Sequence, residues 1–347
     1  MIFQYIKTEN KYPFDRHLID GIRELGHRVE EIEIQGSRFG KYILLFKNLL
    51  KIHRKDIVFI GYSSPYIAII SGIFFMVSRQ KNIFNAVHSQ YEANVISRKS
   101  SRFSIRAIKF WLSDFLSFHL SGKILFESDA QIKYIHKLTL LPMKKMVRSF
   151  TGVNEKDFYL NKNIKKLSKF TVLFRGRFLP ESGIETVVQT AHILDGTGIQ
   201  FRIIGHGYLH VEYNKIKDAL DPKNMEELTK TLPIEELRDK MQECHISLGQ
   251  LAINDRLERT LPCKIFESLS MGLPYLTGRN AGALELLTED KTCFCVEPGN
   301  AEDLAKKILF LRDNPHQLEV VAENGYVLYK EKLTSKHLAE DLLKRCF

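Results

Sequence analysis

Residues 260–285 read TLPCKIFESLSMGLPYLTGRNAGALE, and they carry the clearest structural signal in the chain. Pro262 suits the first position of a helix, and the Gly-Leu-Pro that follows residue 271 ends one, so a short helix is predicted over residues 264–271. The apolar run 275–277 predicts a buried strand, and the loop 278–282 then leads into another helix. In this order of helix, strand, loop and helix, two helix N-termini can point toward one anionic ligand.

Lys264 and Glu267 are three residues apart, so they share one face of the first of these helices near its N-terminus. Backbone N–H groups and the helix dipole favour an anion at that end, and a phosphate group therefore suits this position. An ordinary capped helix in another kind of α/β protein is the alternative that this stretch leaves open.

Five positions of the stretch are spaced as Pro-x-Lys-x-x-Glu-x-x-x-x-Gly-x-Pro, namely Pro262, Lys264, Glu267, Gly272 and Pro274. This spacing resembles the nucleotide-binding half of the GT-B glycosyltransferases, in particular the retaining enzymes of glycosyltransferase family 4. The resemblance implies an α/β chain whose two Rossmann-like domains face each other across a cleft. It implies that the Lys contacts the diphosphate of the sugar donor and that the Glu hydrogen-bonds its ribose. It also places three residues of the next loop close to the donor: Asn280, Ala281 and Gly282.

The resemblance extends upstream of this stretch. Relatives have a Gly-Arg and, a few residues later, a Lys-Gly, and both cations hold the diphosphate. Arg177 matches the Arg, whereas Ser182 stands where the Lys is expected. Either Ser182 donates a neutral hydrogen bond instead, or Arg175 compensates for the missing cation. Gly205 begins a Gly-x-Gly that ends the next predicted strand and is another landmark of the family.

Members of this family often have a further Glu eight residues before the ribose-binding one, in contact with the donor sugar. That position is Arg259 here. If the motif is shifted by one residue in this chain, Glu258 supplies the sugar-binding carboxylate. Otherwise the chain resembles the branch of the family that lacks this carboxylate. Thr260, which directly follows Arg259, is included among the predicted donor-binding residues. A plain surface charge is the alternative for Glu258.

The first half of the chain reads as strands alternating with helices. Strands are predicted over residues 2–6, 56–61, 82–87 and 123–127. His88 directly follows the strand predicted over residues 82–87. It therefore lies at the carboxyl edge of a parallel sheet, where ligands bind. The resemblance implies that such a His hydrogen-bonds the transferred sugar, and a structural His is the alternative. The first loop, residues 7–13, lacks the Gly pair of many relatives, so its contact with the substrate stays open.

Helical periodicity is lost over residues 141–169, which marks a domain boundary. We therefore expect an acceptor-binding domain over residues 1–150 and a nucleotide-sugar-binding domain over residues 151–334. The resemblance implies that a terminal helix, residues 335–347, packs back on the first domain.

The 347 residues include 51 Lys and Arg against 41 Asp and Glu, a net charge of +10. Residues 1–150 hold 24 of these bases and 12 of these acids, so their net charge is +12, and the remaining 27 bases and 29 acids give −2. Such asymmetry indicates an anionic partner, either nucleic acid or phospholipid. Residues 41–55 and 98–120 read as basic amphipathic helices that either lie on a membrane, with Leu45, Leu49 and Trp111 as shallow inserts, or pack on a sheet.

Five scattered Cys do not form a disulfide framework, and the absence of Asp-x-Asp disfavours the metal-dependent sugar transferases of the other common fold. No metal is expected, because Arg177, Lys264 and the helix N-terminus at residues 262–264 can stabilise the departing diphosphate. No cofactor is expected either, and the donor substrate is a UDP- or GDP-sugar. The apolar run 67–77 is too short for a membrane span and reads as a buried helix. No leader is evident, so we expect a cytoplasmic protein, peripheral on the inner face of the cell membrane.

The resemblance to the family, together with these features, implies a metal-independent, retaining hexosyltransferase that acts on a lipid-linked or other glycan acceptor in surface polysaccharide synthesis. Arg177, Lys264 and His88 are the expected catalytic residues. A GT-B scaffold that has lost turnover and serves as a partner subunit is one alternative. A basic nucleic-acid-binding α/β protein is another, although no recognised nucleic-acid module is present and we expect no nucleic acid as partner.

Overall fold

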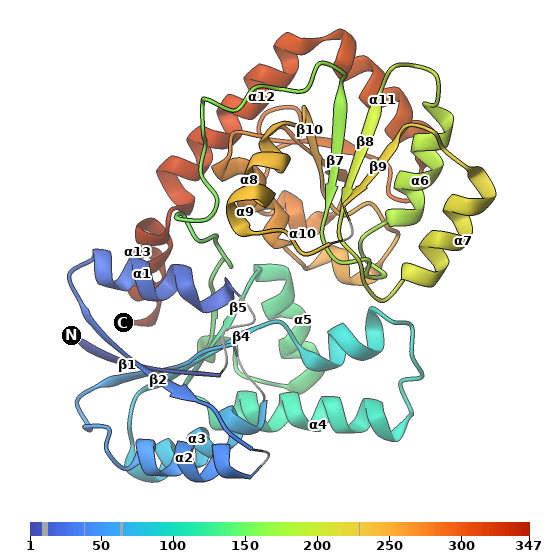
Figure 1. Cartoon of the computed structure of the whole chain (residues 1–347). Helices are drawn as coiled ribbons and strands as arrows, with labels where there is room; N and C mark the ends of the chain where they lie inside the picture. Colours follow the sequence, from blue (N-terminus) through green and yellow to red (C-terminus); the bar gives the residue numbers. More distant parts are fainter. Residues whose placement is uncertain (9–12, 38, 63–64, 229) are drawn as a thin grey trace. The chain divides into compact units, whose positions relative to one another are not determined.

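The computed structural model describes residues 1–8, 13–37, 39–62, 65–228 and 230–347. The chain divides into two compact units, which are described separately. Unit 1 comprises Met1–Asn154 and Leu333–Phe347, and unit 2 comprises Glu155–Lys332 (Figure 1). Four residues of the Gly-poor first loop, 9–12, lie outside the described residues.

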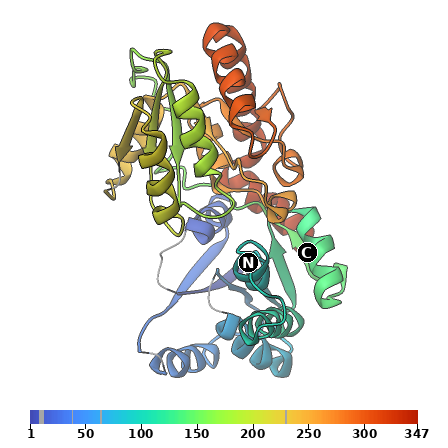
Figure 2. The same ribbon diagram turned by 90° about the vertical axis from the view of Figure 1, so that its right-hand side faces the viewer.

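Unit 1 contains a six-stranded, wholly parallel sheet in the order β2-β1-β3-β4-β5-β6. The strands are β1 (Ile2–Thr8), β2 (Arg28–Ile34), β3 (Ile57–Ile60), β4 (Asn82–Val87), β5 (Lys123–Phe126) and β6 (Met146–Arg148). The helices are α1 (Arg16–Glu24), α2 (Gly40–Leu49), α3 (Pro65–Ser78), α4 (Ile105–Leu120), α5 (Asp129–Thr139) and α13 (Ser335–Cys346). Helices α2, α3 and α4 lie on one side of this sheet, and α1 and α13 lie on the other (Figures 1 and 2).

Unit 2 repeats this plan with the strand order β12-β11-β10-β7-β8-β9, again all parallel. Its strands are β7 (Thr171–Arg175), β8 (Gln200–Ile204), β9 (Met225–Leu228), β10 (Ile246–Leu248), β11 (Tyr275–Gly278) and β12 (Phe294–Val296). Its helices are α6 (Ile184–Ile193), α7 (His210–Leu220), α8 (Ile234–Gln242), α9 (Cys263–Ser270), α10 (Ala281–Leu284), α11 (Ala301–Asp313) and α12 (Pro315–Leu328). The predicted α/β fold of two Rossmann-like units is confirmed.

Local sequence explains many of these elements. Strands β3 and β4 are buried along their whole length, as expected of strands covered by helices on both faces. The Ser128 side chain accepts a hydrogen bond from the backbone N–H of Gln131 and so caps α5. Thr334 caps α13 in the same way, and α13 packs against α1 in unit 1. A Cβ added at Gly21 of α1 would lie 2.0 Å from the carbonyl oxygen of Ser335, so this packing requires a glycine.

Three predictions for unit 1 are wrong. The helix expected over residues 41–55 ends at Leu49, because the chain must turn before β3 pairs with β1. The stretch expected to be an irregular boundary contains β6, an edge strand of three residues that is too short to show a period. The helix expected to be buried, α3, leaves Met76 and Val77 exposed. Among the described residues, no helix is long and apolar enough to cross a membrane.

Candidate functional site

The strand order of unit 2 reverses at β7, and this reversal positions the candidate site. Strands β8 and β9 lie to one side of β7, and β10, β11 and β12 lie to the other. The loops that leave β7 and β10, residues 176–183 and 249–262, therefore start from adjacent strands at the carboxyl edge of the sheet. Open α/β sheets bind ligands at such a switch point.

Three charged side chains meet at this edge, and we call them the carboxyl-edge cluster: Arg175, Lys264 and Glu267. Arg175 is the last residue of β7, and its Nη1 donates to both carboxylate oxygens of Glu267, at 2.7 and 2.6 Å. Glu267 and Lys264 both lie on α9 and are buried. Two cations thus surround one carboxylate, and the cluster carries one excess positive charge when all three are ionised.

Lys264 has few partners for a buried ammonium group. Its Nζ lies 3.5 Å from the carbonyl oxygen of Gly249 and 4.2 Å from the centroid of the Phe174 ring. Burial, together with the neighbouring Arg175 guanidinium, lowers the pKa of Lys264 to about 7, although Glu267 opposes this change. An incoming anion would relieve both penalties.

Two glycines allow the backbone to approach this cluster closely. A Cβ added at Gly205, directly after β8, would lie 1.9 Å from the carbonyl oxygen of Gly176. One added at Gly176 would lie 2.8 Å from Cε of Lys264. Any other residue at either position would displace the loop or the lysine, so both are needed to hold the carboxyl-edge cluster beside the loops.

The structure brings together the four predicted residues around α10: Thr260, Asn280, Ala281 and Gly282. A Cβ added at Gly282 would lie 2.6 Å from the backbone nitrogen of Thr260. Thr260 is buried, and its Oγ1 has no hydrogen-bond partner among the described residues. Asn280 donates through Nδ2 to the carbonyl oxygen of Gln250, at 3.2 Å. Gln250 follows Gly249, the residue near Lys264, so this group adjoins the carboxyl-edge cluster. Helix α10 itself has only four residues.

The two predicted diphosphate contacts in the loop after β7 differ. Arg177 is exposed, and no side-chain partner for it is found in the described part of the chain. Ser182 is buried, and its Oγ accepts a hydrogen bond from the backbone N–H of Ile184 at 3.3 Å. The hydroxyl therefore supports the start of α6, and Arg175 is the second cation at this edge.

Glu258 and Arg259 occupy different environments. Glu258 is exposed at the end of a 3-10 turn, Asp255–Glu258, whereas Arg259 is buried and pairs with Asp255 at 2.7 Å. A second ion pair, between Glu181 and Arg256, ties the loop after β7 to this turn. Sequence reasoning missed that pair and treated Arg175 only as a substitute cation. No local signal exists for either pair, because the Arg175 and Glu267 positions are 92 residues apart and those of Glu181 and Arg256 are 75 apart.

His88 belongs to unit 1 and directly follows β4, as predicted. Its Nε2 lies 3.5 Å from the hydroxyl oxygen of Tyr62. The preceding residue, Val87, has a φ of 60°, which is strained for a β-branched residue, and the pairing of β4 with β5 is irregular there. The backbone is therefore distorted where it presents His88. Asp15 lies at the same edge of this sheet, buried, and accepts hydrogen bonds from Tyr5, Tyr62 and Asn85.

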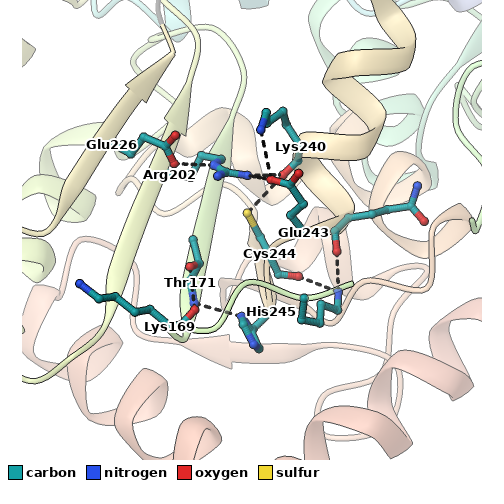
Figure 3. Close-up of polar contacts among 10 residues, drawn as sticks. Lys169, Thr171, Arg202, Glu226, Lys240, Glu243, Cys244 and His245 are labelled. Carbon is teal, nitrogen blue, oxygen red and sulfur yellow. Dashed lines mark hydrogen bonds and ion pairs between the residues drawn. The ribbon is translucent and has the colours of Figure 1, made fainter. Parts of the chain in front are cut away.

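A second set of charges lies toward the amino ends of the strands of unit 2, and we call it the amino-edge cluster: Lys166, Arg202, Glu226 and Glu243. Figure 3 shows Arg202 between Glu226 and Glu243. Arg202 contacts Glu226 at 2.7 Å and Glu243 at 2.5 Å. Lys166 donates to the carbonyl oxygens of Gln242 and Cys244, at 2.9 and 2.7 Å. These bonds satisfy the C-terminal end of α8, so the cluster is a helix-capping network. Among the residues that the structure describes, no group of three His, Cys, Asp or Glu side chains is arranged to hold a metal.

Curated relatives match about half of this chain. A glycosyltransferase of amylovoran biosynthesis, AmsK from Erwinia amylovora, is 24% identical over 184 residues, which are 51% of this chain and 44% of the relative. The alpha-D-kanosaminyltransferase of Streptomyces kanamyceticus is 26% identical over 173 residues, which are 49% of this chain and 44% of the relative. The chain thus spans less than half the length of these relatives.

Solved structures match almost the whole chain. Anabaena HepE, determined in complex with UDP and glucose, has a TM-score of 0.74 at 14% identity, covering 99% of this chain and 98% of HepE. Sucrose-phosphate synthase from Thermosynechococcus elongatus has a TM-score of 0.73 at 13% identity, with the same coverage. At these identities the likeness shows the fold, which is GT-B.

Residues 155–327 match the family described as glycosyl transferases group 1. This segment is nearly the whole of unit 2 and contains the carboxyl-edge cluster, the residues around α10 and the loop with Arg177. Unit 2 of this GT-B chain therefore belongs to the glycosyl transferases group 1 family.

Proposed function

We propose that this protein transfers a sugar from a nucleotide diphosphate sugar to a glycan acceptor in surface polysaccharide synthesis. The observation that carries the proposal is the carboxyl-edge cluster, in which a buried lysine with few partners lies beside an Arg–Glu pair at the switch point of the sheet. The polysaccharide role is supported by the similarity to AmsK, and a uridine nucleotide as donor is supported by the UDP complexes of HepE.

Charge balance favours a diphosphate at this site. Arg175, Lys264 and Arg177 supply three positive charges and Glu267 one negative charge, which leaves +2 for the two negative charges of a sugar-linked diphosphate. The diphosphate gains negative charge as the glycosidic bond breaks, and cations already in place stabilise that change at no cost of reorganisation. In this proposal Lys264 and Arg177 do so without a metal.

Glu267 can bind ribose while it keeps its pair with Arg175. A carboxylate accepts up to about four hydrogen bonds. Arg175 uses one position on each oxygen of Glu267, so two further positions remain for the two ribose hydroxyl groups. In this proposal Arg175 fixes the orientation of the carboxylate, Lys264 binds the diphosphate, and Thr260 and Asn280 lie beside the donor.

Three finer parts of the proposal rest on the family resemblance: the product keeps the anomeric configuration of the donor, the sugar is a hexose, and the acceptor is lipid-linked. The resemblance also implies that His88 hydrogen-bonds the transferred sugar. The coupling constant of the anomeric proton in the NMR spectrum of the product distinguishes retention from inversion.

Titration calorimetry with UDP, GDP, ADP and dTDP, each paired with its nucleoside, tests the donor site. We expect one diphosphate to bind at least about tenfold more tightly than its nucleoside, because the charge-assisted hydrogen bonds go to phosphate. A protein that binds none of the four, or binds nucleoside and diphosphate equally, would contradict the proposal. The selected nucleotide sugar is then assayed for transfer to polyprenyl-diphosphate-linked acceptors.

A second candidate is a GT-B scaffold that binds the donor without turnover and acts as a partner subunit. The observation in its favour is Ser182, whose buried hydroxyl supports α6 where relatives have a phosphate-binding lysine. Donor binding with no transfer by the protein alone, followed by transfer when a partner enzyme is added, would establish this candidate and exclude the first.

A further inference from the structure

Three neighbouring helices of unit 1 present apolar side chains to solvent. Helix α3 contacts both α2 and α4, and all three lie on the same side of the sheet (Figures 1 and 2). Exposure is high for bulky residues, reaching 76% at Phe39, 78% at Val77 and 88% at Ile105. We call this surface the apolar face, and it consists of Phe39, Ile43, Phe46, Leu50, Tyr66, Ile73, Met76, Val77, Ile105, Ile108, Leu112 and Leu116.

These residues form one stripe on each helix. On α2 and its flanks they are three or four apart, at positions 39, 43, 46 and 50, and on α4 they are at 105, 108, 112 and 116. Each helix also has a buried stripe toward the sheet, which includes Leu45, Phe75 and Phe118. A helix that covers a sheet needs only the buried stripe. The second stripe on all three helices is an exposed apolar surface of the kind that marks an interaction site.

This part of the chain is also cationic on its exterior. Residues 40–122 contain three acidic residues, Asp56, Glu92 and Asp114, and all three are buried. Each accepts a hydrogen bond inside unit 1: Asp56 from Gln4, Glu92 from Gln131 and Asp114 from Ser89. The same residues contain twelve bases, namely Lys41, Lys47, Lys51, Arg54, Lys55, Arg79, Lys81, Arg98, Lys99, Arg102, Arg106 and Lys109. The positive charges of this segment therefore have no exposed acidic counterpart within it.

We propose that the apolar face docks on an anionic phospholipid bilayer, with its bulky side chains in the interfacial region and the flanking bases against the lipid headgroups. A surface with apolar stripes beside unopposed positive charge matches the boundary between acyl chains and anionic headgroups. A second copy of the same face would bring like charges together, and nucleic acid would leave the apolar stripes without a partner. The inference does not depend on the proposed transfer reaction, and it adds the place where that reaction occurs.

The inserting residues differ from those that the sequence indicated. Leu45 and Leu49 are buried against the sheet, so the prediction that they insert is wrong. Trp111 is also unsuitable, because its Nε1 donates to the carbonyl oxygen of Leu138 at 3.2 Å and holds α4 to α5. In this proposal the inserting residues are those of the apolar face, among them Ile43, Met76 and Ile108.

Co-sedimentation of the full chain with vesicles of phosphatidylcholine alone, or with an equimolar mixture of phosphatidylcholine and phosphatidylglycerol, tests this proposal. We expect the wild type to bind the anionic vesicles. The triple variant Ile43→Gln, Met76→Gln and Ile108→Gln should bind them at least about tenfold more weakly, because three apolar side chains no longer leave water. The matched control is Val211→Gln, Val320→Gln and Val327→Gln, which changes exposed apolar residues of unit 2 and should bind like the wild type.

A second variant, with Lys47, Lys51, Arg106 and Lys109 replaced by Gln, separates charge from insertion. This variant should lose most of its preference for anionic vesicles. Added salt should weaken the binding of the wild type to anionic vesicles toward the level of the variant, because exposed charges are screened over about 8 Å at physiological ionic strength. Failure of the wild type to bind anionic vesicles would overturn the proposal, as would equal binding by the two triple variants.

Light scattering on the same proteins tests the alternative that a second copy of the chain binds the apolar face. A wild-type dimer that becomes monomeric in the Ile43, Met76 and Ile108 variant, with no vesicle binding, would assign the face to a second copy and overturn the proposal. Circular dichroism reports whether each variant is folded. Nucleoside diphosphate titrations of the same variants report on unit 2 alone, so failure of the donor site and failure of membrane docking are seen separately.

Discussion

Two clusters of charge lie toward opposite edges of one sheet in unit 2, each around a buried cation, and they differ in how completely they are paired. In the amino-edge cluster, Arg202 has two carboxylates and a carbonyl oxygen, and Lys166 has two carbonyl oxygens at normal hydrogen-bond distances. In the carboxyl-edge cluster, Lys264 has one carbonyl oxygen at 3.5 Å and an aromatic ring. The first cluster satisfies its cations, and the second leaves a cation short of acceptors.

Completeness of pairing separates structural charge from ligand-binding charge within one domain. Burial alone does not distinguish the clusters, because Arg202 and Lys264 are both buried. A fully paired network stabilises the fold, and a ligand adds nothing to it. A cation that lacks acceptors carries a desolvation penalty that an anionic ligand can remove. If the two clusters have these separate roles, substitutions at the carboxyl edge should change donor affinity and substitutions at the amino edge should change stability.

The largest effect is expected from Glu267→Ala. It removes the acceptor for two ribose hydroxyl groups, each bond worth roughly 1.5–3 kcal/mol, so donor affinity should fall by more than about a hundredfold. Glu243→Ala, which removes an acceptor from the amino-edge cluster, is the control and should leave donor affinity unchanged. Glu267→Gln serves if the alanine variant does not fold. Unaltered donor affinity in the folded Glu267 variant would refute the assignment of this carboxylate.

Arg202→Met should have the opposite profile. Its loss leaves Glu226 and Glu243 without their shared partner and a carbonyl oxygen of α8 unsatisfied, which should lower the free energy of unfolding by about 2–3 kcal/mol. Donor affinity of the folded variant should match the wild type. Urea denaturation and calorimetry measure the two quantities, and weakened donor binding with unchanged stability would mean that the two edges have been assigned the wrong way round.

A smaller effect is expected from pH. The pKa of Lys264 is lowered to about 7 without ligand, and a bound diphosphate raises it, so binding takes up a proton above pH 7. Affinity for the nucleotide sugar should therefore be highest below pH 7 and fall about tenfold between pH 6 and 8, which corresponds to about 1.4 kcal/mol. The sugar-linked diphosphate does not titrate in this range. Lys264→Met should abolish the pH dependence of this affinity. A wild-type affinity that does not change with pH would show that Lys264 stays charged over this range.

Part of this comparison was predictable from sequence. The buried strand Tyr275–Gly278 and helix Cys263–Ser270 follow from apolar runs bounded by Pro and Gly, so Lys264 and Glu267 were expected on one short helix. The bidentate contact of Arg175 with Glu267 was not predictable, because no local spacing links residues so far apart in the chain. The same holds for Lys166 and Arg202, because no local spacing links them to the carbonyl oxygens at the C-terminal end of α8 that they contact.

The surface helices of unit 1 show a second limit of prediction from the sequence. Periodicity identified α2 and α4 as amphipathic but did not show which of two apolar stripes faces the sheet. Leu45 and Leu49 pack inward, whereas Ile43 and Phe46 remain exposed, and the choice is set by tertiary packing in the core that includes Ile60 and Phe84. Likewise, nothing in the sequence marks Val87 for a positive φ. The prediction of a membrane-facing surface stays a prediction, with the inserting residues now reassigned.

We propose that the carboxyl edge binds a diphosphate through a cation that the fold leaves underpaired, Lys264. Titration calorimetry of the wild type, Lys264→Met and Lys166→Met with the selected nucleoside diphosphate and its nucleoside tests it directly. We expect Lys264→Met to weaken the diphosphate at least about tenfold and leave the nucleoside unchanged, because only the phosphates contact the ammonium group. Lys166→Met should alter neither affinity. Equal losses for both ligands in Lys264→Met, or a selective loss of diphosphate affinity in Lys166→Met, would contradict the claim.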